Sequence, residues 1–181
     1  MARSFTQEVE IVRLGGHGDG VAETAKGLVF VPYTAPGDRV GVRLLRAVEQ
    51  GMAAELLELR EAGPDRVEPP CAHFHDCGGC ALQHLSAGFQ ATWKQSQVRD
   101  ALRRRGLDPD VVLPTATVAP GDRRRAEFVL RKVGGRVLAG FNRRLSAKIV
   151  DLEMCLVLDP ALVALLPPLR ETFAPLLAPG A

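Results

Sequence analysis

The 181-residue sequence predicts a mainly β chain in which an N-terminal β-barrel is followed by a small α+β region. Short apolar runs separated by glycine and proline fill the first sixty residues, which is typical of consecutive β-strands. One stretch, 86–105, carries the spacing of a helix, and a Gly-Gly pair at 134–135 divides a later strand-like segment in the manner of a hairpin. Eighteen glycines and thirteen prolines agree with a chain that turns often.

The barrel is predicted from five apolar segments in residues 1–60. No helical pattern interrupts them, and short strands at this spacing favour a five-stranded OB-like barrel. The segments are Val9–Leu14, Val21–Ala22, Leu28–Val31, Val40–Leu44 and Ala53–Leu59.

The string G-H-G-D-G at 16–20 resembles a glycine-rich loop that binds a dinucleotide or S-adenosylmethionine. Such a loop must open a helix within a strand–helix–strand unit. Here Pro32 and Pro36 follow before any helix could run. The string is therefore interpreted as a hairpin turn.

Residues 61–70, with three prolines, are predicted to be a linker. Beyond it, Ser86 can cap a helix that runs to Arg105, where Gly106 ends it. Leu85, Phe89 and Trp93 form an apolar stripe that we expect to pack in a core. Val98, Ala101 and Leu102 are expected to continue the stripe on a rotated face.

The segment after residue 122 predicts a small basic sheet. Arg123–Lys132 is expected to form a strand, and Val137–Asn142 its hairpin partner across Gly134-Gly135. Lys148–Asp151 is expected to form a third strand that leads to Cys155.

Residues 111–150 hold nine basic and only two acidic side chains, although the net charge of the whole chain is +2. Such a concentration of cations repels itself unless an anion is nearby, which favours binding to the phosphates of a nucleic acid. The residues predicted to contact RNA are Arg123, Arg124, Arg125, Arg131, Lys132, Arg143, Arg144 and Lys148.

All four cysteines of the chain can belong to one metal site. Cys71, Cys77 and Cys80 form a C-x5-C-x2-C cluster, and Cys155 follows far downstream. Four thiolates suit a tetrahedral metal or an iron–sulfur cluster. Glycines between the last two clustered cysteines let the backbone turn and bring N–H groups toward sulfur without a Cβ clash.

Disulfides and zinc are the two other uses that four thiols could have. Disulfides are disfavoured because the chain begins without a secretory signal and has no membrane-spanning apolar run, which predicts a cytoplasmic protein. Zinc is the stronger rival, with His73 and His75 as possible further ligands. Zinc ribbons usually present two C-x2-C pairs, so the spacing favours iron–sulfur over zinc.

Three strings in the sequence resemble a known family. C-A-H-F-H-D-C-G-G-C-A-L-Q-H-L resembles the cluster region of the bacterial S-adenosylmethionine-dependent RNA 5-methyluridine methyltransferases. R-R-R-A-E-F and G-F-N-R-R-L-S-A-K-I-V-D-L look like the next stretches of that family. The resemblance covers nearly the whole chain. It departs from the family pattern at Leu156, where proline is usual, and at Ala147, where histidine is common.

The resemblance implies a specific organisation. Residues 1–60 would be a TRAM domain that binds RNA, and 61–158 a central domain with a 4Fe–4S cluster on Cys71, Cys77, Cys80 and Cys155. Residues 159–181 would begin the connection to a Rossmann-like domain that carries the S-adenosylmethionine site and the catalytic cysteine in the intact protein. The tail is expected to be a helix whose apolar side packs on that missing domain.

The resemblance also implies a function. The chain is expected to be the N-terminal part of an RNA (uracil-C5) methyltransferase, with ribosomal RNA (23S) a better expectation than transfer RNA. With no catalytic residue of its own, it would bind RNA without transferring methyl groups. The alternative is a zinc- or iron–sulfur-stabilised module that binds RNA or senses redox state and has no enzymatic activity. The sequence does not predict an oligomeric state.

Overall fold

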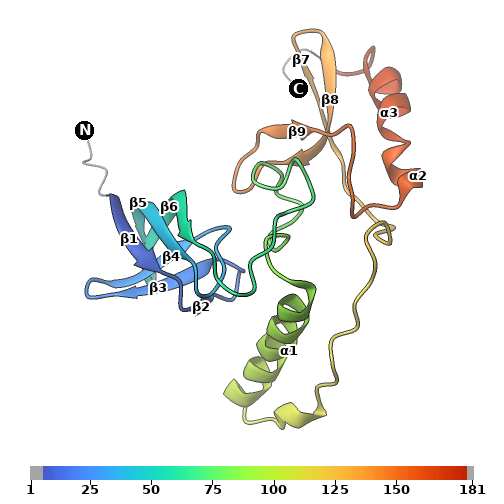
Figure 1. Cartoon of the computed structure of the whole chain (residues 1–181). Helices are drawn as coiled ribbons and strands as arrows, with labels where there is room; N and C mark the ends of the chain where they lie inside the picture. Colours follow the sequence, from blue (N-terminus) through green and yellow to red (C-terminus); the bar gives the residue numbers. More distant parts are fainter. Residues whose placement is uncertain (1–5, 179–181) are drawn as a thin grey trace. The chain divides into compact units, whose positions relative to one another are not determined.

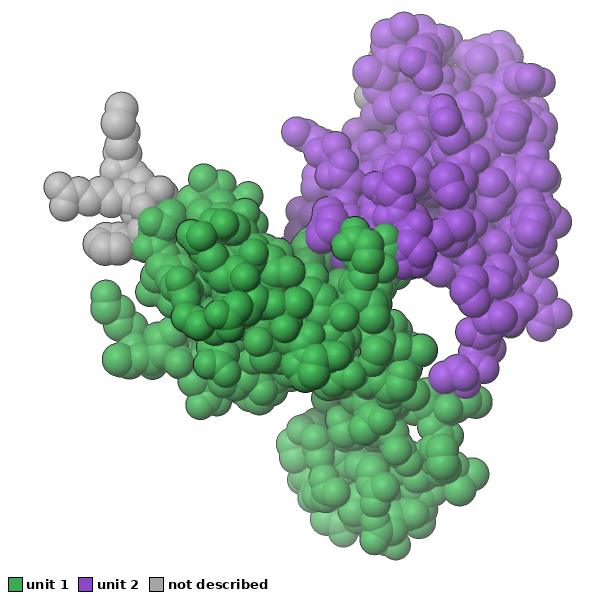
Figure 2. Space-filling model, in the orientation of Figure 1, with its two compact units in different colours: residues 1–69, 82–116 green, residues 70–81, 117–181 purple. Residues whose placement is uncertain are grey.

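The computed structural model describes residues 6–178, which form two compact units (Figure 1). Unit 1 comprises residues 1–69 and 82–116, and unit 2 comprises residues 70–81 and 117–181 (Figure 2). Both units are therefore built from two separate stretches of the chain. In particular, the cysteine loop at 70–81 belongs with the C-terminal third of the sequence.

A six-stranded sheet forms most of unit 1, in the order β1-β5-β6-β4-β3-β2. The pairing is antiparallel except between β4 and β6, which run parallel. The strands are β1 (Thr6–Glu10), β2 (Arg13–Leu14), β3 (Gly20–Thr24), β4 (Gly27–Val31), β5 (Arg39–Val48) and β6 (Gly51–Glu61).

All five predicted strand segments are present, and the first is divided in two. Ile11 N–H donates to the carbonyl of Asp38, just before β5, over 2.9 Å. Val12 N–H donates at the same distance to Val21, in β3. The chain thus changes its hydrogen-bonding partner between these residues, which separates β1 from β2.

The core of the sheet contains alternate apolar residues of its strands, because successive side chains of a strand point to opposite faces. The turn at 16–20 is a hairpin, as predicted: Gly15 N–H donates to Asp19 O over 2.7 Å, and Gly18 has φ +84. The buried residues of this core are Val9, Ile11, Ala22, Val29, Val31, Val40, Val42 and Ala54.

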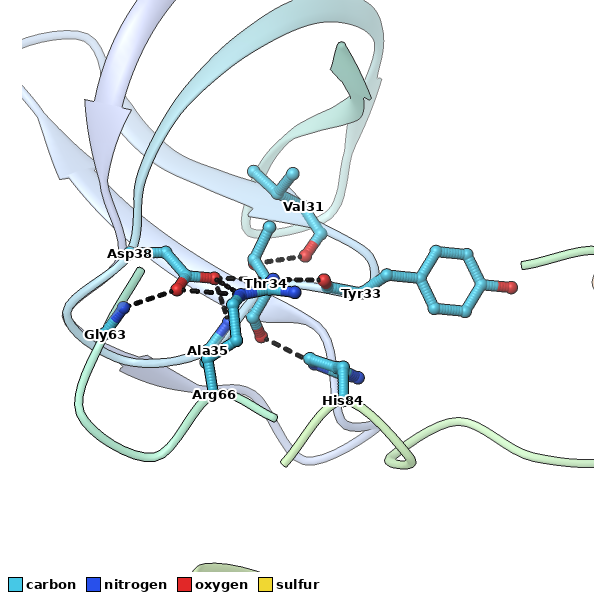
Figure 3. Close-up of polar contacts among 8 residues, drawn as sticks. All are labelled: Val31, Tyr33, Thr34, Ala35, Asp38, Gly63, Arg66 and His84. Carbon is cyan, nitrogen blue, oxygen red and sulfur yellow. Dashed lines mark hydrogen bonds and ion pairs between the residues drawn. The ribbon is translucent and has the colours of Figure 1, made fainter. Parts of the chain in front are cut away.

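The stretch expected to be a linker is anchored to unit 1 at its start. The carboxylate of Asp38, which is fully buried, accepts hydrogen bonds from the N–H groups of Gly63 (2.8 Å) and Ala35 (2.6 Å) (Figure 3). Arg66 donates to the same carboxylate at 2.7 Å and to Tyr33 O at 2.8 Å. Residues 63–66 are therefore part of the folded unit 1.

Helix α1 (Ala87–Arg104) begins and ends where the sequence predicts. Ser86 Oγ accepts the Phe89 N–H over 3.2 Å, and Gly106, just beyond the helix, has φ +70. Leu85, Phe89 and Trp93 pack in one cluster with Leu14 and Ala35, as expected. A short 3-10 helix, η1 (Pro109–Val111), follows in the same unit.

The expected continuation of the helix stripe is wrong. Val98 is 51% exposed and Ala101 is also exposed, while Leu102 is half-buried. In the described part of unit 1, the apolar cluster around Leu14, Ala35 and Leu85 takes in Phe89 and Trp93 and no later residue of α1.

Unit 2 contains a three-stranded antiparallel sheet in the order β7-β8-β9. The strands are β7 (Val129–Val133), β8 (Arg136–Asn142) and β9 (Ile149–Asp151). Gly134 and Gly135 join β7 to β8 with φ values of +56 and +82, the left-handed conformation of a type I′ hairpin.

The first predicted strand of this sheet is shorter than expected, because 123–128 is not part of it. Arg123 N–H donates to Val157 O over 3.1 Å, and Asp159 N–H donates to Arg123 O over 3.0 Å. These residues therefore make one isolated bridge with the segment before α2 and do not extend β7.

The tail forms two helices, α2 (Pro160–Val163) and α3 (Leu166–Phe173). Leu166 is only 1% exposed and packs with Ala139, Val150 and Leu152. The expectation that the apolar side of the tail has nothing to pack on is therefore wrong for its inner face. Leu165 and Leu176, in contrast, remain exposed.

Among residues 6–178, no helix combines the length and the apolar composition that crossing a membrane would require.

Candidate metal centre and nucleic-acid interface

The four cysteines all lie in unit 2, three of them on the loop 71–80 and Cys155 between β9 and α2. None forms a disulfide. Burial raises the pKa of the Cys77 thiol, the Gly79 N–H at 3.4 Å from its sulfur lowers it, and the thiols of Cys80, Cys155 and Cys71 raise it further. Cys77 thus interacts electrostatically with each of the other three.

The glycines beside Cys77 lie where a side chain would collide with neighbouring atoms. Gly78 N–H donates to Asn142 O over 2.9 Å, and a Cβ on Gly78 would stand 2.8 Å from that oxygen. A Cβ on Gly79 would lie 3.4 Å from Cys77 Sγ and 3.3 Å from the Phe141 ring. The loop therefore approaches β8 through its backbone, and one amide points at a sulfur.

These features fit a thiolate-bound metal group in the type of donor and in their location. Among the described residues, however, no three Cys, His, Asp or Glu side chains are gathered closely enough to hold a metal ion. Ligation by Cys71, Cys77, Cys80 and Cys155 therefore stays a prediction.

The eight basic residues predicted to contact RNA also belong to unit 2. Two of them make contacts that hold the unit together. Lys132 Nζ donates to Ala174 O over 2.6 Å, and Arg131 donates to Ala147 O over 3.2 Å. Because both acceptors are backbone carbonyl oxygens, these contacts do not neutralise the positive charges of Lys132 and Arg131.

Two other arginines, Arg143 and Arg123, lie beside the cysteine loop. Cys77 pairs with Arg143 as an isolated antiparallel bridge, and Arg143 also forms an ion pair of 3.2 Å with Asp76. Arg123 donates from Nε to Arg125 O over 3.2 Å, and its guanidinium carbon lies 5.7 Å from the centre of the Phe141 ring.

Arg123, Arg143 and Arg144 line an open cavity of about 500 Å³. Sequence reasoning named these arginines and the two glycines of the cysteine loop, Gly78 and Gly79, and did not single out Phe141, which also lines the cavity. An apolar residue in an alternating strand, such as Phe141, is usually a core residue, and no sequence signal distinguished it. Gly79, Glu127, Asn142 and Leu145 also line the cavity.

The sequence of this chain is similar to those of known proteins. Residues 5–57 match the TRAM domain. An uncharacterized RNA methyltransferase of Brucella suis is 44% identical over 180 residues, which is 99% of this chain and 42% of that protein. The 23S rRNA (uracil(1939)-C(5))-methyltransferase of Halomonas elongata is 41% identical over 176 residues, which is 96% of this chain and 36% of that protein.

A solved structure is also similar. The Pyrococcus abyssi tRNA (uracil-54, C5)-methyltransferase in complex with S-adenosyl-L-homocysteine matches with a TM-score of 0.55 and 25% identity. The match covers 91% of this chain and 36% of that one. This chain spans about two fifths of the length of the relatives it matches. The resemblance stated from the sequence is thereby confirmed: the chain contains a TRAM domain and is related, over nearly its whole length, to part of the bacterial RNA methyltransferases.

Proposed function

We propose that this chain is the RNA-recognition and iron–sulfur portion of an S-adenosylmethionine-dependent RNA (uracil-C5) methyltransferase. One observation carries the proposal: the cysteine loop and the basic sheet are joined through the Cys77–Arg143 pairing. Whatever Cys77 binds is therefore mechanically connected to an arginine that can bind phosphate. The TRAM domain and the names of the relatives support RNA as the partner.

In this proposal a 4Fe–4S cluster is held by Cys71, Cys77, Cys80 and Cys155. When bound, the cluster supplies four strong bonds that fix the loop against the end of β8. Two contacts support this arrangement: the Gly79 N–H is directed at Cys77 Sγ, and the Gly78 N–H donates to Asn142 O. The role is structural, and the loop positions Arg143 and Arg144.

Methyl transfer is proposed for the whole protein. Uracil-C5 chemistry uses a thiolate that attacks the base, and a base that removes the C5 proton. All four thiols of this chain belong to the proposed ligand set. Residues 1–181 are therefore proposed to recognise RNA without supplying the nucleophile or the S-adenosylmethionine site.

Ribosomal RNA is the proposed substrate class. The Halomonas elongata relative is named as a 23S rRNA enzyme and is 41% identical, whereas the tRNA enzyme of known structure is 25% identical. Because that tRNA enzyme matches 91% of this chain, the presence of a TRAM domain and a cysteine region does not by itself distinguish the two substrates. The higher identity is the argument for ribosomal RNA.

The first test is metal analysis on protein purified without oxygen. About four iron and four sulfide per chain, the content of a cysteine-ligated cubane, supports the cluster. One zinc without sulfide overturns it and favours the alternative of a zinc-stabilised RNA-binding module. A reversible redox couple in a chain that does not bind RNA favours the redox-sensing alternative.

The division of roles is tested by titration with S-adenosylmethionine. Residues 1–181 are expected to show no saturable binding by calorimetry while they retain salt-dependent binding to a ribosomal RNA fragment. Saturable binding of S-adenosylmethionine to the chain contradicts the proposal.

A further inference from the structure

We propose that the cavity between the cysteine loop and β8 is a site for one unstacked nucleotide of single-stranded RNA, with Leu145 as a wedge at its rim. This inference rests on the proposed RNA binding and specifies the form of RNA that the site accepts. It follows from the lining of the cavity, from the fixed position of Arg123 and from the backbone of Leu145.

The cavity has the size and chemistry of a nucleotide site. Its volume of about 500 Å³ lies in the range of about 300–1,000 Å³ typical of small-molecule sites. The lining holds three arginines and one carboxylate, that of Glu127. Asp76 pairs with Arg143 outside the lining, so the site keeps a net positive charge that suits a phosphate. Glu127 and Asn142 add groups that can hydrogen-bond to the edge of a base.

Arg123 offers a flat surface on which a base can stack. Its guanidinium lies over the Phe141 ring, and its Nε donates to Arg125 O. Phe141 is held in turn by Phe128, with ring centres 5.6 Å apart. A guanidinium with two such contacts is already oriented, and RNA-binding proteins commonly stack bases on arginine planes.

Leu145 is an apolar side chain presented to solvent by a strained backbone. It is 92% exposed and has φ +52, a conformation that non-glycine residues rarely adopt. It lies in the turn between β8 and β9, next to Arg144 and near Lys148, and it lines the cavity. Leucine in such a position can enter between two bases and separate them while neighbouring cations hold the phosphates.

Single-stranded RNA is the occupant that these features favour. In a duplex, the bases are stacked and the A-form major groove is too narrow for side chains to read. A stacking plane beside an apolar wedge instead requires a base that has left its neighbours. The cysteine loop, through Gly79, forms one wall of this site.

The test uses the metal-loaded 181-residue chain and a 12-nucleotide single-stranded RNA that carries one 2-aminopurine, whose fluorescence rises when it unstacks. The wild-type chain is expected to raise the fluorescence and to bind this strand at least about tenfold more tightly than the matching RNA duplex. Leu145→Ala is expected to keep the affinity within about threefold and to lose most of the fluorescence rise. Val133→Ala, an exposed apolar residue at the other end of β8's hairpin, should leave the rise intact.

Substitutions at Arg123 distinguish the contribution of base stacking to RNA binding from that of charge. Arg123→Lys keeps the charge and removes the plane, and should weaken binding by about tenfold, the loss expected for one stacked base. Arg136→Ala, which removes a charge at the far end of the same sheet, should leave the fluorescence rise intact.

Two results overturn the inference, and they are distinguishable. If the wild-type chain binds RNA with no fluorescence rise, or if Leu145→Ala and Arg123→Lys behave as wild type, the cavity is not a nucleotide site although RNA binding stands. If the wild-type chain binds none of the RNAs, the proposed function fails as well. Circular dichroism and iron content verify that each variant is folded and loaded.

Discussion

Arg66 Nη2 lies 2.7 Å from Oδ2 of Asp38, and this ion pair is almost completely buried in unit 1. The same carboxylate accepts the N–H groups of Ala35 and Gly63, so it joins the loop before β5 to the segment after β6. A buried carboxylate with all its partners in place is a rigid connection. The ion pair stabilises unit 1 only while both charges are present, since removing Asp38 or Arg66 leaves the other charge buried without a counter-ion.

Asp38→Asn is therefore expected to lower the unfolding free energy of unit 1 by about 3–5 kcal/mol, because Arg66 loses its counter-ion in a buried site. Trp93, the single tryptophan of the chain, lies in α1 of the same unit, so its fluorescence in a urea titration reports the change. Glu55→Gln is the matched control. It breaks an exposed pair with Arg43 and should cost about 1 kcal/mol or less. Equal losses in the two variants contradict the prediction.

Asp151 gives unit 2 a pH dependence. Burial acts to raise the pKa of Asp151, but the Ala139 N–H and the Arg170 guanidinium outweigh it and lower the pKa below its usual value. Stability from a lowered carboxyl pKa is fully present above the pKa of the unfolded chain, about 3.9, and is lost as the pH falls through the folded-state pKa. Below about pH 4, α3 should therefore loosen from the sheet.

The measurement is hydrogen exchange of the Ala139 amide, which donates to Asp151 Oδ1 over 2.9 Å. Asp151→Asn should speed the exchange at pH 7 and remove the additional loss of protection at low pH. Asp122→Asn, a change in an exposed loop carboxylate of the same unit, should alter neither. Identical pH profiles for wild type and Asp151→Asn would rule out this role.

Local patterns predicted much of the fold because they depend on neighbouring residues. The cap at Ser86, the glycine stop at Gly106 and the Gly134-Gly135 hairpin are all where the sequence places them. Each depends on backbone geometry within a few residues. The five strand segments of residues 1–60 were predictable for the same reason, whereas the TRAM assignment depended on the resemblance to a known family.

Features set by contacts between distant segments were not predictable. A shared metal site implied that the cysteine loop lies near Cys155, but nothing local predicted that Cys77 pairs with Arg143. Nor did the sequence predict that Leu166 is buried against the sheet of unit 2. For the site, the basic residues were visible as a charge pattern. The strained backbone of Leu145 and the position of Arg123 over Phe141 have no local signature.

The proposed cluster predicts a specific sensitivity to cysteine replacement. Cys155→Ser should reduce the iron content of the purified chain strongly, because a hard hydroxyl replaces a soft thiolate in a site that needs four. His73→Ala and His75→Ala should retain wild-type iron. If instead a histidine variant loses metal while Cys155→Ser keeps it, the ligand set is different from the one proposed.

Glycine substitutions test the close approach of the cysteine loop to β8. Gly78→Ala places a Cβ 2.8 Å from the Asn142 carbonyl, which is backbone and must shift, so iron retention and melting temperature should both fall. Gly88→Ala is the control. Gly88 lies in α1 with nothing near its added Cβ, and alanine there should stabilise the helix by about 0.5–1 kcal/mol. Wild-type iron content in Gly78→Ala would show that the loop does not need this approach.

The salt dependence of RNA binding tests the phosphate contacts. Arg123, Arg125 and Arg131 are proposed to contact phosphates, and each contact with a single strand contributes about 0.7 to the slope of log K against log salt. Arg125→Gln should therefore weaken binding to a ribosomal RNA fragment and flatten the slope by about that amount. Arg99→Gln, which removes an arginine of α1 that is paired with Asp110, outside both the TRAM domain and the basic sheet, is the matched control for a general loss of charge. The contact is disproved if Arg125→Gln keeps the wild-type slope, because a cation that releases no counterion does not touch the RNA backbone.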